Sequence, residues 1–152
     1  MKRVIAMLVC FFILGSTAAI SAVAESPECQ QIIVSQTVEN LGNGVFFVET
    51  IYVPAVQTFS SAKTGTKVAQ CINGGKTIYT VSVTGTFTYD GTTSEATSST
   101  CDIATYVESA VILNGYAYTS GASACAFGSV SYDGATLQKT VTLTCDKDGN
   151  LS

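Results

Sequence analysis

The chain alternates apolar and hydroxyl side chains with the period of a β-strand. The clearest case is Thr77 to Tyr89, where apolar residues at every second position are separated by threonine or serine, with Gly85 as the one gap. A period of two places the apolar side chains on one face of a strand and the hydroxyls on the other. Gly85 indicates a bulge, a bend or a close approach of another backbone. Leu137 to Cys145 repeats the alternation and predicts a second such strand.

Other segments are rich in strand formers but alternate less cleanly. Val45 to Val53 reads V-F-F-V-E-T-I-Y-V, and neither of its faces is polar. This composition predicts a strand that is covered in part on both sides or lies at a sheet edge. Lys67 to Ile72 predicts a further strand. Ala122 to Tyr132 could support a helix through its alanines, but its interleaved glycines and serines favour a small-residue strand.

Turn signals recur between these segments, and no long stretch has helical periodicity. The run from Thr92 to Thr100 is almost entirely threonine and serine and predicts a solvated loop. Together these features predict an all-β fold, most simply a single antiparallel β-sandwich that is Ig-like in general architecture, with a small up-and-down β-barrel as the alternative. The expected turns are Asn40–Gly44, Asn73–Gly75, Asp90–Gly91, Asn114–Gly115 and Asp133–Gly134.

The first 24 residues have the features of a cleaved secretory signal. Lys2 and Arg3 are followed by an uncharged apolar run, and Ala22-Val23-Ala24 offers small residues at the positions that a signal peptidase recognises. The expected organisation is a signal peptide at 1–24, a lead-in at 25–40 and a sandwich domain at 41–152. A secreted or extracellular location is therefore expected, with no membrane attachment after cleavage; an uncleaved anchor is the competing interpretation.

Charge narrows the range of partners. Removal of Lys2 and Arg3 would take the net charge from −4 to −6 and leave no arginine, with the remaining lysines scattered along the chain. Nucleic-acid binding and attachment to anionic lipid both require clustered cations, so neither is expected.

Catalytic constellations are sparse. The chain has no histidine, which excludes Ser-His-Asp and Cys-His arrangements. Ser60 and Lys63 have the S-x-x-K spacing but fall in a predicted loop. A carboxylate-dependent hydrolase would need a facing pair of acids, and its candidates are Glu49, Glu95, Asp102 and Glu108. A non-enzymatic protein is the expectation.

No cofactor is expected, and the sequence offers one candidate metal site. There is no C-x-x-C pair, which argues against zinc. Asp146, Asp148 and Asn150 have the spacing that opens a calcium loop, although an Asp-Gly turn explains the same residues.

Two further features can carry chemistry or contacts. Lys139 lies on the apolar face of the last predicted strand, where a lysine beside an acid and an asparagine could form an isopeptide bond. Tyr116 and Tyr118 share one face of a predicted segment and form a possible contact patch for a carbohydrate or a protein.

Five cysteines follow the signal peptide, so at most two internal disulfides can form and one thiol is left over. Fifteen arrangements are possible, and the residues alone do not select one. Structural disulfides are favoured over metal binding because export leads to an oxidising compartment.

Four ordered stretches resemble a known group of proteins: Leu41–Thr50, Thr80–Gly91 (T-V-S-V-T-G-T-F-T-Y-D-G), the Ser/Thr run that ends in Cys101, and Val141–Ser152 (V-T-L-T-C-D-K-D-G-N-L-S). The group comprises functionally uncharacterised small secreted β-rich proteins of Gram-positive anaerobic bacteria, many from the gut. The resemblance implies export and a β-rich fold but supplies no active-site residues. The present chain differs in lacking tryptophan and in having additional cysteines.

The resemblance also implies a disulfide pattern. Members often carry a cysteine after the Ser/Thr loop and one in the last strand, which implies a Cys101–Cys145 bridge worth about 4 kcal/mol in the chain-entropy model. Cys71–Cys125 is then the second expected bridge. Cys29 is the spare thiol, either free or linking two molecules, so the protein would be a monomer or a Cys29-linked dimer.

The sequence thus predicts a secreted, non-enzymatic module that binds an unknown protein or carbohydrate at the cell exterior. A secreted effector, such as a bacteriocin-like factor or inhibitor with Thr92–Thr100 as its reactive loop, is the first alternative. The small carboxylate hydrolase is the second.

Overall fold

The computed structural model describes residues 31–55 and 61–152, and every regular element in these ranges is a β-strand. The proposed signal peptide and Cys29 lie outside the described residues. The strands are β1 (Gln31–Gly42), β2 (Val45–Pro54), β3 (Ala62–Asn73), β4 (Lys76–Tyr89), β5 (Ser94–Thr105), β6 (Val111–Ser120), β7 (Ser123–Tyr132) and β8 (Ala135–Thr144).

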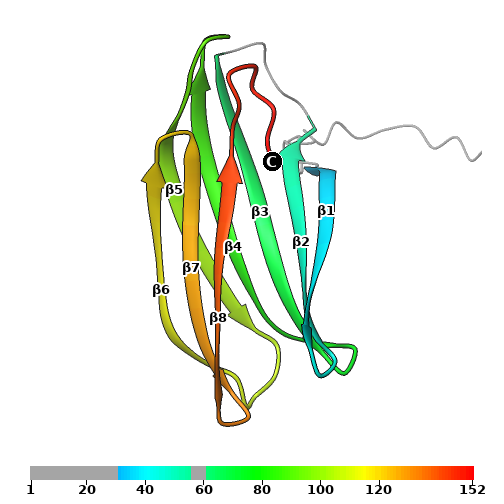
Figure 1. The fold of residues 1–152 in the computed structure, drawn as a ribbon. Coiled ribbons are helices and arrows are strands. Elements are labelled where there is room, and N and C mark those ends of the chain that lie inside the picture. The colour runs from blue at the N-terminus through cyan, green and yellow to red at the C-terminus, as the bar shows by residue number, and fades with distance from the viewer. Residues whose placement is uncertain (1–30, 56–60) are drawn as a thin grey trace, which may run out of the picture.

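The strands form two antiparallel sheets that face each other (Figure 1). One sheet has the order β1-β2-β3-β4-β5 and the other the order β6-β7-β8, and neither closes into a barrel. The predicted β-sandwich is confirmed. Its connections differ from the Greek key of immunoglobulin domains, because every neighbour in a sheet is also a neighbour in the sequence.

The smaller sheet covers only part of the larger one. Strands β6, β7 and β8 pack over β5, β4 and β3, while β1 and β2 extend beyond the edge strand β8 (Figure 1). The core between the sheets is built from the inward residues of β4 and those of β7 and β8. Val81, Val83, Val130, Val141 and Leu143 are fully buried, so the alternation in the β4 and β8 sequences is confirmed.

Small residues on β4 and β7 let the two sheets approach closely. A Cβ built on Gly85 would lie 2.5 Å from the Cβ of Ala124 on β7. The predicted close approach of another backbone at Gly85 is therefore the reason for this glycine. Gly128 on β7 lies in the same way against Val81.

Tight turns join the sequential strands. Asn43-Gly44, Gly74-Gly75 and Asp133-Gly134 all have positive φ at both residues, as type I′ hairpin turns require. The turns predicted at Asn73–Gly75 and Asp133–Gly134 are confirmed, and the one expected at Asn40–Gly44 narrows to Asn43-Gly44.

The domain begins earlier than predicted. Residues 31–40, assigned to the lead-in, belong to strand β1, which pairs antiparallel with β2. Every residue of β1 is exposed, so its sequence was under no pressure to alternate, and the pattern that identifies a half-buried strand is missing.

The loop predicted at Thr92–Thr100 is also wrong, because most of it forms β5. Threonine is a good strand former, and two serine hydroxyls of this run bond across the sandwich. Ser94 Oγ donates to the carbonyl of Cys145 at 2.6 Å, and Ser99 Oγ donates to that of Cys125 at 3.0 Å.

The turn predicted at Asn114–Gly115 is wrong as well: both residues lie inside β6, beside a bulge that follows Ile112.

The last residues fold back along β8. Thr144 and Ser152 exchange two backbone hydrogen bonds of 2.9 Å, and Cys145 bridges to Leu151. Leu151 lies against Gly65 on the inner side of β3. This segment therefore closes part of the open side of the sandwich. Within residues 31–55 and 61–152, no helix is long and apolar enough to cross a membrane.

Candidate functional site

The strongest candidate surface is the outer face of the three-stranded sheet. Ala126 and Val130 of β7 are fully buried between the sheets, so Phe127 points the other way, to the outside. In the register of β6 and β7, Tyr116 lies directly opposite Phe127. The Tyr116 and Phe127 rings stack with their centroids 5.1 Å apart and their planes inclined by 27°.

Tyr118 extends this aromatic cluster along β6. Its ring centroid lies 6.1 Å from that of Tyr116, with the planes inclined by 32°. Tyr116 is 51% exposed and Tyr118 is 45% exposed. We call the outer surface of β6–β8 around Tyr116, Tyr118 and Phe127 the aromatic face. Its two tyrosines are those singled out from the sequence. Phe127 was missed, although its position one residue from buried Ala126 places it on the opposite side of the strand.

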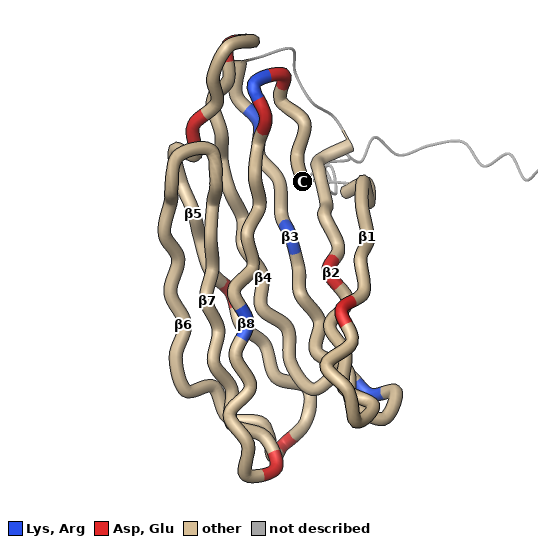
Figure 2. Tube along the Cα trace, viewed as in Figure 1, with Lys and Arg blue, Asp and Glu red and all other residues tan. Residues whose placement is uncertain are grey.

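The aromatic face carries no charge. The strands β6 and β7 contain no charged residue (Figure 2). β8 contains only Lys139, whose ion pairs with Glu39 and Glu49 hold it on the inner side of the sheet. The register places polar uncharged side chains beside the rings: Asn114 opposite Ser129, Ser129 opposite Gln138, and Phe127 opposite Thr140. The surface therefore combines exposed ring faces with amide and hydroxyl groups, without an ionic group.

The buried thiol of Cys125 lies next to Tyr118 on the neighbouring strand. Cys125 lies opposite both Tyr118 and Thr142 in the sheet, and its Sγ is 3.7 Å from Thr142 Oγ1. The side-chain hydrogen bond between Tyr118 and Cys125, followed by the charge interaction between them, raises the pKa of Tyr118 above its usual value. Tyr118 is therefore a neutral phenol at physiological pH, able to donate or accept a hydrogen bond.

A charge network occupies the open side of the sandwich, and Figure 2 shows one basic position on β8 and acidic positions on β1 and β2. Lys139 Nζ lies 2.6 Å from Glu39 Oε2 and 2.8 Å from Glu49 Oε1, and Lys67 Nζ is 3.2 Å from Glu49 Oε2. Lys139 also lies 4.7 Å from the centre of the Phe47 ring, within the range of a cation–π contact.

These contacts argue against an isopeptide bond at Lys139. Amide formation needs a neutral amine and a protonated acid. Burial alone would lower the pKa of Lys139, but its hydrogen bonds to Glu39 and Glu49 hold that pKa above its usual value. Burial alone would raise the pKa of Glu49, but Lys139 and Lys67 hold it below 4.5. Both groups therefore stay charged, and the network ties β8 to β1 and β2 by ion pairs.

The acids proposed for a hydrolase are not brought together. Glu49 faces the inside of the sandwich, in register with buried Ala69, whereas Asp102 is exposed on the opposite face of the same sheet, in register with Ser82. Glu108 is exposed in the connection between β5 and β6. These residues therefore do not form a facing pair of carboxylates.

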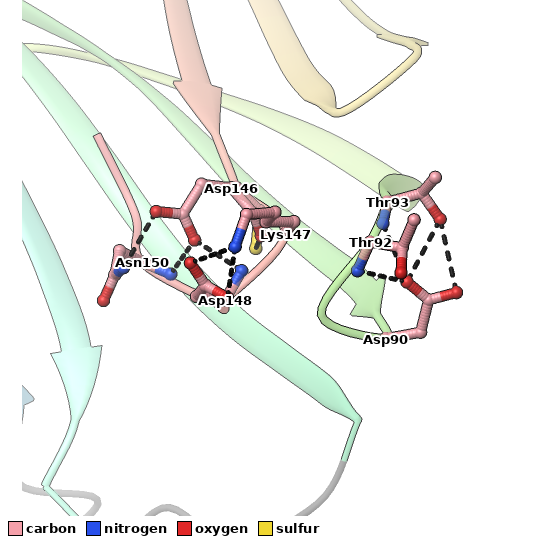
Figure 3. A network of polar contacts seen from close by, with 8 residues as sticks. Asp90, Thr92, Thr93, Asp146, Lys147, Asp148 and Asn150 are labelled. Carbon is pink, nitrogen blue, oxygen red and sulfur yellow. Dashed lines mark hydrogen bonds and ion pairs between the residues drawn. The ribbon is translucent and has the colours of Figure 1, made fainter.

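Glu95 lines a separate polar pocket of about 290 Å³ together with Asp90 and Thr93. Asp90 accepts hydrogen bonds from the backbone N–H groups of Thr92 and Thr93 at 2.8 and 2.7 Å (Figure 3). These bonds lower the pKa of Asp90. The carboxylate therefore stabilises its own turn and stays ionised, which does not suit it to the role of a proton donor.

The calcium hypothesis for Asp146, Asp148 and Asn150 is not supported. Asp146 turns back onto its own loop (Figure 3): its Oδ1 accepts the backbone N–H groups of Asp148 and Asn150, and its Oδ2 accepts the side-chain amide of Asn150. Asp148 pairs with Lys147 through both oxygens at 2.8 Å. In the part of the chain that the structure describes, no group of three or more Asp, Glu, Cys or His residues could hold a metal ion.

The predicted disulfides are corrected by the structure, in which Cys71, Cys101, Cys125 and Cys145 are all free. Cys101 lies opposite Val83, whereas Cys145 lies beside Ser94, which is opposite Tyr89. Six residues separate Val83 from Tyr89 along β4, or about 20 Å, far beyond the reach of a disulfide.

The second predicted pair is also too far apart. Cys71 is buried between the sheets opposite Tyr79, while Cys125 lies on the outer side of β7 near Ser99, which is opposite Gly85. The separation along β4 is again about 20 Å. Sequence order carried no information about these positions, because they depend on strand register. Cys29 lies outside the described residues and remains a predicted free or intermolecular thiol.

Comparison with known proteins adds no relative: no protein-family model, no curated protein and no solved structure matches the chain.

Proposed function

We propose that the protein is exported and acts outside the cell as a non-enzymatic binding module, and that the aromatic face is its binding surface. The observation that carries this proposal is the row of three adjacent rings, two of them about half exposed, on a sheet face without charge. Clusters of half-exposed aromatic rings are uncommon on protein surfaces that contact only water, and such patches often mark binding sites.

Among the expected partners, a neutral carbohydrate fits this face best. Sugar rings present C–H groups that pack on aromatic rings and hydroxyls that bond to amide and hydroxyl side chains. Asn114, Gln138 and Thr140 supply such groups next to the rings. An acidic glycan would find no cation here. The face is the open outer surface of a three-stranded sheet, so an extended chain suits it better than an isolated small molecule.

Affinity electrophoresis tests the binding. Gels containing soluble neutral polysaccharides (hydroxyethyl cellulose, xylan and galactomannan) are compared with a gel containing polygalacturonate. We expect retardation by a neutral polymer and none by the acidic one. Replacing Tyr116 and Tyr118 together by alanine should weaken binding about tenfold per ring. The matched control is Tyr106→Ala, which removes a tyrosine that is 61% exposed outside the aromatic face.

Two results would contradict the proposal. One is the absence of retardation by every neutral polymer. The other is equal retardation of the wild type and the double variant. Export is tested separately by the intact mass of the protein recovered from the culture medium, which should correspond to a chain that begins at Glu25.

A further inference from the structure

Strand β2 has apolar side chains on both of its faces, and the core of the sandwich covers only one of them. The β2 sequence is apolar on both faces, which is typical of a strand covered on both sides. In the structure Phe47, Ile51 and Val53 are covered by the rest of the fold. The other side of β2 forms part of the outer surface of the large sheet, away from the small sheet (Figure 1). Among the described residues, no second layer lies over this outer face, where Phe46, Val48 and Tyr52 are partly exposed.

The neighbouring strands continue this outer surface. In the sheet register, Val38 of β1 lies opposite Val48 of β2, and Phe46 of β2 lies opposite Ile72 of β3. Val38 is 66% exposed, the highest value among the large apolar side chains of the described residues. We call this surface the β1–β3 face; its apolar members are Ile33, Val38, Phe46, Val48, Tyr52, Val68 and Ile72.

The β1–β3 face is also free of charge. The side chains between its apolar members are Gln36, Thr50 and Gln70. The charged residues Glu39, Glu49 and Lys67 point to the other side of the sheet, where Glu39 and Glu49 pair with Lys139 and Lys67 pairs with Glu49. The chain as a whole has a net charge of −4, so two copies repel each other, but they can meet at this face without opposing charges.

The size of the face is adequate for a small interface. Three strands spaced by about 4.8 Å, each about ten residues long, present a flat area of about 500 Å². Two facing copies would cover about 1,000 Å², which lies near the lower limit for a specific protein interface. Two twisted sheets pack face to face with their strands nearly aligned, as in a sandwich.

We infer that a second copy of this chain docks on the β1–β3 face, so that two large sheets pack back to back about a two-fold axis. The interface is isologous: the same residues contribute from both copies. It is non-covalent and does not use Cys29. The apolar outer side of β2 is then covered in the dimer, which accounts for the pattern in its sequence.

Sedimentation velocity at several protein concentrations, with a reducing agent present, tests this interface. The wild type should sediment as a concentration-dependent dimer. Val38→Lys places a cation from each copy in the contact and should weaken association at least about 30-fold. Because Val38 is so exposed, this change leaves the fold of the single copy intact, which a melting curve checks. Val48→Lys should have the same effect from the centre of the face.

Matched controls make the outcome decisive. Thr100→Lys adds the same charge to an exposed site on β5, on the same side of the large sheet but outside the β1–β3 face, and should leave the dimer unchanged. Val38→Ile should also preserve it. A wild type that is monomeric at every concentration would overturn the inference. So would a dimer that survives both lysine substitutions or that dissociates on reduction.

Discussion

Replacing Lys139 by methionine tests how the open side of the sandwich is held. The ammonium group lies between Glu39 and Glu49 and connects β8 to the two strands that the small sheet does not cover. Methionine keeps most of the length of the side chain and its packing against Phe47, but removes the charge. Glu49 would keep one partner, Lys67, at 3.2 Å.

The size of the effect follows from burial. Removing one partner of a fully buried ion pair costs about 3–5 kcal/mol, and removing one from an exposed pair costs about 0–1 kcal/mol. The Lys139 and Glu49 side chains are 13% and 19% exposed, at a side of the molecule that water reaches. We therefore expect a loss of about 2 kcal/mol, which lowers the melting temperature by about 6–10 °C for a domain of this size.

Urea unfolding and thermal melting measure this loss, and a double-mutant cycle with Glu49→Gln isolates the pair. The coupling between the two positions should be at least about 1 kcal/mol. Lys147→Met is the matched control, because Lys147 pairs with Asp148 at the surface and its replacement should leave the melting temperature unchanged. A Lys139→Met variant as stable as the wild type, or a control equally destabilised, would refute the reasoning.

The pH dependence provides an independent check. The folded pKa of Glu49 lies below 4.5, so its stabilisation is complete above pH 4.5 and is lost as pH falls through the lower folded value. The folded pKa of Lys139 lies above 10.5, so its stabilisation is complete below pH 10.5 and is lost as pH rises through the higher folded value. The stability difference between wild type and Lys139→Met should therefore be constant across neutral pH and shrink at both extremes.

Three further predictions concern the core and the thiols. Gly128→Ala should destabilise by about 1–3 kcal/mol in urea unfolding, because the new Cβ would overlap the Val81 side chain; an unchanged midpoint would contradict the close contact of the sheets. Tyr79→Phe should be neutral or stabilising by up to about 2 kcal/mol, since the buried Tyr79 hydroxyl has no hydrogen-bond partner among the described residues; a clear loss would reveal a partner. Burial raises the pKa of Cys71 to about 11, so mass-mapped alkylation at pH 8 should label it only after unfolding, and labelling of the folded protein would place it elsewhere.

The sequence predicted the strands that have one buried face and one solvent-exposed face. Strands β4 and β8 were identified because the packing of the small sheet on the large one requires strict alternation there. The hairpin turns were identified because positive φ favours glycine, asparagine and aspartate, which here gives Gly74 and Asp133. In the single copy, every residue of strand β1 is exposed. Its sequence therefore does not alternate, and it gives no sign that the strand pairs with β2.

Other errors have a common cause, which is that glycine and threonine serve more than one purpose. Gly115 was interpreted as a turn residue, but its φ is not positive; it is small because the Ile103 side chain packs on it. Thr92–Thr100 was interpreted as a loop because it is polar, yet the hydroxyls of Ser94 and Ser99 bond across the sandwich and those of Thr97 and Thr100 bond to β4. The candidate site was predicted in part, since Tyr116 and Tyr118 share a strand, whereas the contribution of Phe127 depends on the pairing of β6 with β7.

The two proposals combine into a testable arrangement. The aromatic face and the β1–β3 face are outer surfaces of different sheets, so a back-to-back dimer would direct its two aromatic faces away from each other. A flat site built on a few rings binds one polysaccharide segment weakly, but two sites on one particle bind a polymer network with an avidity that can exceed the single-site affinity about 100-fold. Val38→Lys, which leaves the aromatic face intact, should then reduce retardation in a neutral polysaccharide gel while Thr100→Lys does not. Equal retardation of the monomeric variant and the wild type would show that each aromatic face acts alone, and the dimer would then need another purpose.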